Sequence, residues 1–241
     1  MRLNKYLSNS GLCSRRKADI LISNGDISIN GNIITELGIN VKDNDIVKYK
    51  GKVIKPVTNY KYILLNKPKN YICSCHDDRG RKTVLDILKP ILKNNKEKDG
   101  SNKIFPVGRL DRNTTGLLLL TNDGDLAHKL THPSSEIIKK YNVILDKPLD
   151  IKDEQKLLKG VNLEDGYFKF DNIKIFENRK EINVKMHSGR NRIIRRTFEY
   201  LGYNVKFLDR YYYCGLTKEN LNVGEYKFIS KKEIINNNES K

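Results

Sequence analysis

Apolar residues recur along the chain with two different spacings, which indicates a mixture of helices and strands. The apolar positions of residues 3–7 have helical spacing, and Ser14 stands where an N-cap is expected, ahead of a second helix over 15–22. Residues 27–29 then alternate between apolar and polar up to Asn30-Gly31, a dipeptide typical of a tight hairpin. The order helix, helix, small sheet predicts a separate module at the start of the chain.

The pattern changes after a short polar linker at residues 56–59. We expect strands over 62–65, 117–120, 141–145, 173–176 and 182–186, and helices over 83–88, 125–130, 152–159 and 192–201. These strands and helices alternate without a regular strand–helix–strand rhythm, which favours an α+β fold over a doubly wound sheet. We therefore predict a small domain over 1–56, a larger domain over 60–230 and a polar C-terminal tail over 231–241.

The net charge narrows the choice of partner. The chain has 46 Lys and Arg against 29 Asp and Glu, a formal charge of +17. An excess of this size points to a polyanion, with nucleic acid first and an anionic membrane surface second. The longest aliphatic run, residues 117–120, is far short of the roughly 20 apolar residues of a membrane span. The N-terminus has no apolar signal segment, so we expect a cytoplasmic protein that does not associate with membranes.

The cysteines do not predict a metal site. Cys73 and Cys75 precede His76, but the spacing is C-x-C and no second pair follows. We expect reduced thiols and no bound metal.

Three adjacent cations, Arg15, Arg16 and Lys17, open the second predicted helix. Cations at this end of a helix are mildly unfavourable, because the helix dipole is positive there. They form either a solvated helix face or the binding site of an anionic ligand such as RNA or DNA.

Residues 2–34, RLNKYLSNSGLCSRRKADILISNGDISINGNII, resemble an S4 domain, the small RNA-binding module of ribosomal protein S4. The resemblance implies that Arg2, Arg15, Arg16 and Lys17 contact phosphates, with the turn at Asn30 close to the RNA.

The densest group of charged residues lies between two apolar stretches of the larger domain. Arg109, Asp111 and Arg112 are bracketed by Gly108 and Gly116, which indicates a loop that leaves the core and returns to it. A carboxylate beside two arginines stays ionised, and so can act as a nucleophile or an electrostatic stabiliser. A structural ion pair that braces a turn would have the same pattern, and the residues alone do not decide between the two.

The segment GRLDRNTTGLLLLTNDGD, residues 108–125, is similar to the catalytic motif of the RsuA/RluA superfamily of pseudouridine synthases. Residues 65–68, 139–143 and 189–196 resemble further motifs of that family in the same order, and the resemblance extends from residue 1 to about 229. It implies a pseudouridine synthase fold, with a mixed, mainly antiparallel sheet and flanking helices. It also implies that Asp111 is the catalytic carboxylate, that Tyr141 lies against the target uracil and that Arg195 bonds Asp111.

The implied reaction converts a uridine of ribosomal RNA to pseudouridine. It involves no net redox change or hydrolysis, so we expect no cofactor. Arg195 should orient Asp111 in a bidentate geometry, and Tyr141 should either stack on the base or accept the proton from C5. The remaining candidate cations are expected to contact RNA or, for Lys67 and Arg109, to brace the site; they are Lys67, Arg109, Arg112, Arg190 and Arg192.

Within the family the chain most resembles the RluB-type branch that acts on large-subunit (23S) rRNA, through residues 79–84, 131–134 and 160–166. Ser188 and Ile193 depart from the usual motif, where Glu and Gln are common. A small-subunit rRNA synthase, and a non-catalytic RNA-binding ribosome-assembly factor that kept the fold, are the alternatives. An Asp-dependent nucleosidase is disfavoured, because no second carboxylate suited to activating water accompanies Asp111. We expect the protein to act as a monomer.

Overall fold

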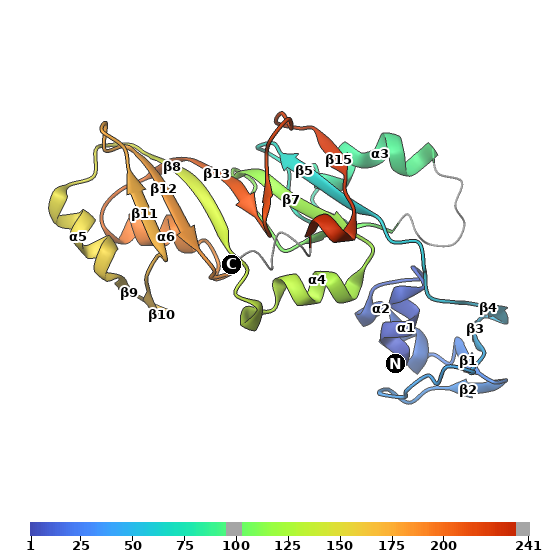
Figure 1. Ribbon diagram of the computed structural model, residues 1–241. Helices are drawn as coiled ribbons and strands as arrows, with labels where there is room; N and C mark the ends of the chain where they lie inside the picture. The colour runs from blue at the N-terminus through green and yellow to red at the C-terminus, as the bar shows by residue number, and fades with distance from the viewer. Residues whose placement is uncertain (95–102, 235–241) are drawn as a thin grey trace. The chain divides into compact units, whose positions relative to one another are not determined.

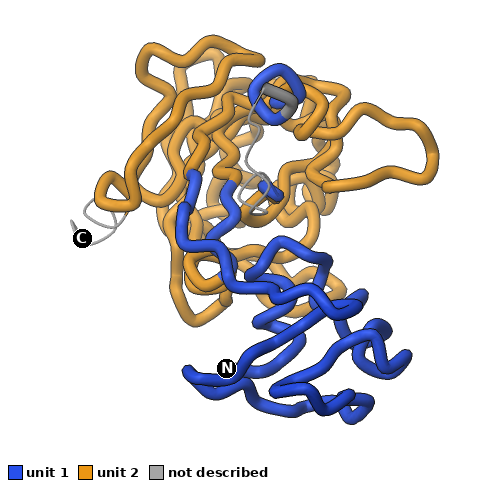
Figure 2. Tube along the Cα trace, turned by 90° about the vertical axis from the view of Figure 1, so that its right-hand side faces the viewer, with its two compact units in different colours: residues 1–61, 88–104, 121–124 blue, residues 62–87, 105–120, 125–241 orange. Residues whose placement is uncertain are grey.

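The computed structural model describes residues 1–94 and 103–234 (Figure 1). The chain divides into two compact units (Figure 2). The first comprises Met1–Lys61, Leu88–Ile104 and Thr121–Gly124, and the second comprises Tyr62–Ile87, Phe105–Leu120 and Asp125–Lys241. The predicted domain limits at 56, 60 and 230 remain predictions.

The first unit contains the predicted order of helix, helix and small sheet. Its elements are α1 (Leu3–Asn9), α2 (Arg15–Ser23), β1 (Ile27–Ile29), β2 (Asn32–Ile34), β3 (Val47–Tyr49) and β4 (Lys52–Val53). The strands form an antiparallel sheet in the order β2-β1-β3-β4. Its core joins both helices to β1 and β3 through Leu3, Leu7, Ala18, Ile22, Ile27, Ile29, Val41 and Val47.

Two local signals in this unit act as the sequence predicts. The Ser14 side chain accepts a hydrogen bond from the Lys17 backbone N–H at 3.3 Å and so caps α2. Asn30 and Gly31 both have positive φ, 52° and 90°, as the tight turn between β1 and β2 requires.

The rest of the described chain is built around one large sheet. Within the described residues this sheet has nine strands, with the main order β11-β12-β8-β13-β7-β5-β15 and with β14 and β6 paired to β13 and β7. The strands are β5 (Tyr62–Lys67), β6 (Phe105–Val107), β7 (Thr115–Thr121), β8 (Lys139–Leu145), β11 (Asn172–Ile175), β12 (Glu181–Met186), β13 (Val205–Tyr213), β14 (Leu216–Thr217) and β15 (Tyr226–Phe228). A separate hairpin consists of β9 (Val161–Leu163) and β10 (Gly166–Phe168).

Helices flank this sheet and connect its strands. They are α3 (Val84–Asn94), α4 (Gly124–Thr131), the 3-10 turn η1 (Pro133–Ser135), α5 (Ile151–Lys159) and α6 (Ile193–Tyr200). Within the described residues, no helix is both long enough and apolar enough to cross a membrane.

The sheet is mixed, which confirms the predicted α+β class. β8 pairs antiparallel with both β12 and β13, whereas β13 pairs parallel with β7. At the parallel pair Gly116 lies opposite Arg210, and a Cβ on Gly116 would lie 2.3 Å from the Arg210 carbonyl oxygen. The close approach of β7 and β13 therefore requires glycine at this position.

Helix α3 extends beyond the predicted range of 83–88, which stops two residues before Pro90. The helix continues to Asn94 with Pro90 inside it. Proline removes only one backbone hydrogen bond, and the apolar pattern goes on past it through Ile91 and Leu92, which are partly buried. We attribute the continuation to the burial of this apolar face.

Residues 231–234 of the predicted polar tail form a short helical turn. The Ser230 hydroxyl and backbone N–H both donate to the Glu233 carboxylate, which caps a short helical turn. Ile234 at the end of that turn is fully buried in the core beside α4 and β7. Residues 235–241 of the predicted tail lie outside the described residues.

Candidate active site

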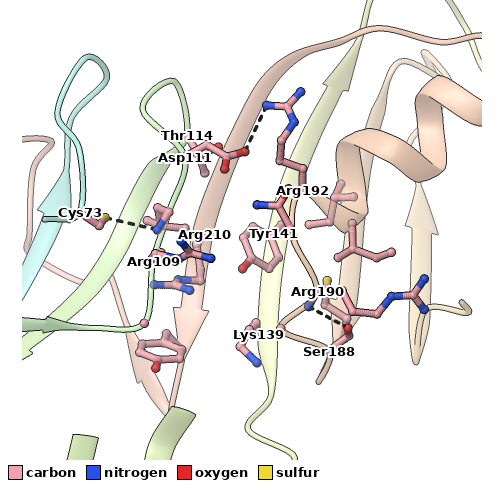
Figure 3. A pocket seen from close by; sticks show the side chains of 18 of the residues that line it. Cys73, Arg109, Asp111, Thr114, Lys139, Tyr141, Ser188, Arg190, Arg192 and Arg210 are labelled. Carbon is pink, nitrogen blue, oxygen red and sulfur yellow. Dashed lines mark hydrogen bonds and ion pairs between the residues drawn. The ribbon is translucent and has the colours of Figure 1, made fainter. Parts of the chain in front are cut away.

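A cavity of about 960 Å³ opens in the second unit. Its walls come from the loop between β6 and β7, from β8 and β13, and from the segment that joins β12 to α6. Figure 3 shows Asp111 near the top of this cavity, with Tyr141 and Arg210 next to each other below it. The cavity brings together seven of the predicted site residues, namely Arg109, Asp111, Arg112, Tyr141, Arg190, Arg192 and Arg195.

The loop that carries Asp111 is held by the end of β5 and by the chain that follows it. Lys67 Nζ donates to the carbonyl oxygens of Thr114 at 2.8 Å and Arg112 at 3.3 Å. The backbone N–H of Asn70 donates to the same Arg112 carbonyl at 2.8 Å. On the other side of Asp111, the Leu110 N–H donates to Cys73 Sγ at 3.3 Å. The backbone on both sides of the carboxylate is therefore fixed by direct hydrogen bonds.

Lys67 was expected either to contact RNA or to brace the site, and these contacts place it under the Asp111 loop. Its side chain is fully buried, and Nζ also donates to Pro68 O at 3.0 Å. Burial lowers the pKa of Lys67 to about 8, with a further lowering from Arg210, while Cys73 and Asp111 raise it. The burial of this ammonium group fits the expected bracing role better than a contact with RNA.

Asp111 lies between two arginines of the last motif. Its Oδ2 is 3.6 Å from Arg195 Nε and 3.6 Å from Arg192 Nη1. The Arg195 side chain is 11 % exposed and that of Asp111 33 %, so this ion pair is partly shielded from solvent. The carboxylate therefore lies next to two positively charged guanidinium groups.

The geometry of the Asp111–Arg195 pair differs from the predicted bidentate bond. A separation of 3.6 Å exceeds the range of a direct N–H···O hydrogen bond. Arg195 instead donates from Nη1 to Val205 O at 2.9 Å, which anchors its guanidinium to the start of β13. The contact between Asp111 and Arg195 is therefore an ion pair, in which the backbone holds the Arg195 guanidinium.

Arg192 was predicted to contact RNA, and it lies beside Asp111. It is the N-cap of α6 and has a left-handed backbone, with φ 47° and ψ 28°. This conformation is uncommon for a residue with a side chain. Arg192 pairs with both Asp111 and Glu199 at the cavity rim.

Arg190 lines the cavity but is committed to the β9–β10 hairpin. Nε donates to Asp165 at 3.0 Å, Nη1 to Tyr167 O at 2.8 Å, and Nη2 to Asp165 and to Gly166 O. Hydrogen bonds from Arg196 and then Arg190 hold the pKa of Asp165 well below its usual range. The structure thus ties Arg190 to the protein through its three guanidinium nitrogens, which does not fit its predicted contact with RNA.

The predicted RNA-binding residues of the first unit separate into two groups. Arg2, Arg15, Arg16 and Lys17 are exposed, and the last three form the first turn of α2. The Asn30 amide instead donates to Asp45 at 2.8 Å and accepts from the Ile46 N–H at 2.9 Å. Asn30 therefore shapes the turn, and its side chain is already occupied.

Tyr141 lies in the middle of β8 and is buried, with its ring on the cavity wall. Lys139, two residues earlier on the same face of the strand, donates to His187 O at 2.7 Å and Ile137 O at 3.0 Å. Burial, followed by repulsion from Arg210, lowers the pKa of Lys139 to about 8. The spacing of Lys139 and Tyr141 was a signal in the sequence that could have placed Lys139 in the site.

Sequence reasoning missed Arg210. It lies on β13 and is 2 % exposed, and its Nε donates to Leu117 O at 2.8 Å. The available signal was the adjacent charged pair Asp209-Arg210 between Leu208 and the aromatic run 211–213, because charged residues are rarely buried unless they have a partner or a function.

Cys73 takes part in the loop contact above, and within the described residues no group of three or more His, Cys, Asp or Glu side chains is placed to hold a metal ion. The expectations of no metal and no cofactor remain predictions.

Two family matches define the class of protein, in which an RNA-binding module is joined to an RNA-modifying catalytic domain. Residues 1–47 match the S4 domain, and residues 61–200 match the RNA pseudouridylate synthase family. The chain belongs to the RNA pseudouridine synthase family, whose members isomerise uridine in RNA.

Individual relatives match over nearly the whole chain. The chain is 38 % identical to ribosomal large subunit pseudouridine synthase B of Bacillus subtilis, over 97 % of this chain and 93 % of the relative. It is 34 % identical to the dual-specificity RNA pseudouridine synthase RluF of Escherichia coli, over 98 % of this chain and 77 % of the relative. A crystal structure of a pseudouridylate synthase superposes with a TM-score of 0.66 at 27 % identity, covering 98 % of this chain and 99 % of that one.

Proposed function

We propose that this protein converts a uridine of large-subunit ribosomal RNA to pseudouridine, with Asp111 as the catalytic carboxylate. The observation that carries the proposal is the position of Asp111. It lies 3.6 Å from both Arg192 and Arg195, in the same cavity as Tyr141.

The reaction breaks the N1–C1′ bond, turns the uracil and joins C5 to C1′. It needs an anionic group next to C1′ and C6, a surface that holds the detached base, and an acceptor for the C5 proton. Asp111 meets the first need, because it is a carboxylate paired with two arginines and its loop is fixed by Lys67 and Cys73. It acts either by addition to C6 or at C1′.

Tyr141 meets the second need. A buried aromatic ring on a strand is a rigid platform, and base–aromatic stacking contributes roughly 1–3 kcal/mol. Its hydroxyl is also a candidate acceptor for the C5 proton. The target nucleotide must leave a helix, or lie in a loop, to reach this ring.

The substrate class rests on two supports. The segments at 79–84, 131–134 and 160–166 resemble the large-subunit branch, and the B. subtilis relative carries a large-subunit name. Ribosomal RNA is the partner, bound through the cations of α2 and of the cavity rim. The protein acts in the cytoplasm, as a monomer and without a cofactor. Light scattering on the free protein tests the oligomeric state.

The experiment that tests the proposal is pseudouridine mapping by carbodiimide modification and primer extension. Ribosomal RNA is compared from cells that carry the wild type or Asp111→Asn, which preserves the shape of the side chain and removes its charge. We expect one large-subunit site to lose its pseudouridine in the variant.

Other outcomes select the alternatives. Loss at a small-subunit site means a small-subunit synthase, and loss in transfer RNA means a broader substrate range. Unchanged RNA, with binding retained by both proteins, means a ribosome-assembly factor and contradicts the catalytic proposal.

A further inference from the structure

Arg210 is a buried cation that the reaction scheme above does not use. Its guanidinium is charged at all accessible pH values, yet within the described residues no carboxylate pairs with it. The neighbouring carboxylate, Asp209, is occupied by Lys218 at 2.5 Å and Thr115 at 2.6 Å. A buried charge of this kind is costly unless something else binds it.

The protein provides hydrogen-bond partners for only some of the N–H donors of this guanidinium. Nε donates to Leu117 O, and the planar group lies 4.2 Å from the centroid of the Tyr213 ring. Nη2 is buried and has no hydrogen-bond partner among the described residues. Native proteins rarely leave such a donor unused, and exceptions often mark a binding site.

The location of this donor is informative. Five buried side-chain atoms lack a partner in the described part of the chain, and those of Arg210 and Thr114 belong to residues that line the cavity. Arg210 is also beside Tyr141, the ring proposed to carry the base, and below Asp111 (Figure 3). A ligand that fills the cavity against Tyr141 therefore meets a donor without a protein partner.

We infer that Arg210 recognises the target base by donating a hydrogen bond from Nη2 to a carbonyl oxygen of uracil; this rests on the proposed function. With N1 and C6 held near Asp111, the atom on the opposite side of the ring from N1 is C4, which carries O4. Arginine has only hydrogen-bond donors, so it can bind the O4 carbonyl of uracil. The N4 amino group of cytosine is also a donor, so Arg210 would disfavour cytosine. Arg210 thus selects uridine over cytidine.

The same contact can be made with the base in the substrate and in the product. Turning uracil about the line from N3 to C6 exchanges N1 with C5 and C4 with C2. When C5 has replaced N1 beside C1′, O2 occupies the position that O4 held before. A single fixed donor can therefore hold the base before and after the turn, and the base does not leave the cavity while it is detached.

The test combines a change in the enzyme with a change of one substrate atom. The probes are an RNA fragment containing the uridine mapped in the Asp111 experiment, and the same fragment with 4-thiouridine or cytidine there. Sulfur is a weaker acceptor than oxygen, so we expect 4-thiouridine to lower kcat/KM of the wild type by about 10-fold or more. Arg210→Met should lower kcat/KM on uridine by about 10- to 100-fold, the size of a lost hydrogen bond to a charged group, with little further loss on 4-thiouridine.

Binding of the cytidine fragment gives an independent readout. The wild type should bind it more weakly than the uridine fragment, and Arg210→Met should bind the two nearly equally. Arg179→Met is the matched control, because Arg179 is also hydrogen-bonded, to Leu149 O and Glu154, but does not line the cavity. It should keep both the preference for uridine and the penalty on 4-thiouridine.

The outcomes separate this inference from the proposed function. A wild type that forms no pseudouridine defeats the proposed function. A wild type that forms it but reacts equally well with 4-thiouridine overturns the inference, even if Arg210→Met fails to fold. A folded Arg210→Met that keeps the full preference for uridine over cytidine overturns it as well.

Discussion

The Asp111 carboxylate and the Arg195 guanidinium face each other at 3.6 Å, and Arg195 is fixed by its own bond to Val205 O. The strand β13 therefore sets where the arginine lies, and the braced loop after β6 sets where the aspartate lies. Each side chain is held in position independently of the other. This arrangement is expected where charges must be in place before a reaction begins.

The first prediction concerns this pair. Arg195→Gln should lower the single-turnover rate of pseudouridine formation by about 100-fold, because it removes the less exposed of the two charges beside Asp111. The Arg192 side chain is 45 % exposed, so solvent screens its charge, and Arg192→Gln should lower the same rate by about 10-fold or less. Rapid-quench assays on one RNA fragment measure both, and a larger loss for Arg192→Gln would contradict the ranking.

The second prediction concerns Lys67 and pH. Folding lowers the pKa of Lys67 from 10.5 to about 8, so between these values the unfolded chain holds a proton that the folded protein has lost. The free energy of unfolding of the wild type, relative to Lys67→Met, should therefore rise from pH 8 to pH 10.5, by up to roughly 3 kcal/mol. Below pH 8 the difference between the two proteins should be constant.

Urea denaturation of both proteins across this range measures the effect. Lys174→Met, which changes an exposed lysine, is the control and should show no such slope. A constant difference between wild type and Lys67→Met up to pH 10.5 would mean that Lys67 titrates normally in the folded protein.

The third prediction concerns the parallel strand pair. Gly116→Ala forces a methyl group to within 2.3 Å of the Arg210 carbonyl oxygen and should lower the free energy of unfolding by about 3 kcal/mol or more, with loss of activity. Gly166→Ala is a matched control: φ is also positive, at +105°, but no atom lies within 4 Å of the added carbon. It should cost about 1 kcal/mol, from backbone strain alone. Equal losses in the two variants would mean that β7 and β13 can move apart.

The fourth prediction concerns the cations at the start of α2. Replacing Arg15, Arg16 and Lys17 together by Gln should weaken binding of rRNA and reduce the slope of log K against log salt by about 2 to 3, because each lost phosphate contact removes close to one unit. The rate of a saturated single turnover should change little. The triple control Lys152, Lys159 and Lys174 to Gln removes the same charge from exposed positions of the second unit. If the control lowers the slope equally, the effect comes from net charge and not from an S4 contact.

Local patterns in the sequence determined the elements and the family. The Ser14 cap, the Asn30-Gly31 turn and the alternation in β1 act over a few residues, so they can be read without the fold. The motif around Asp111 identified the chemistry for the same reason, since its residues are contiguous. The sequence patterns did not predict the extension of α3 past Pro90 to Asn94, where an apolar face is partly buried. They also did not predict β13 (Val205–Tyr213), the strand that carries Arg210, in which charged residues interrupt the apolar pattern.

Only the tertiary structure decided what each cation does. Lys67, Arg190 and Arg210 look like surface charges in the sequence, yet the fold buries Lys67 under the Asp111 loop, ties Arg190 to Asp165 and places Arg210 beside Tyr141. The physical reason is that a hydrogen bond of a long side chain depends on which strand lies next to it. That neighbour is set by sheet pairing between segments far apart in the chain, and no local pattern of residues encodes it.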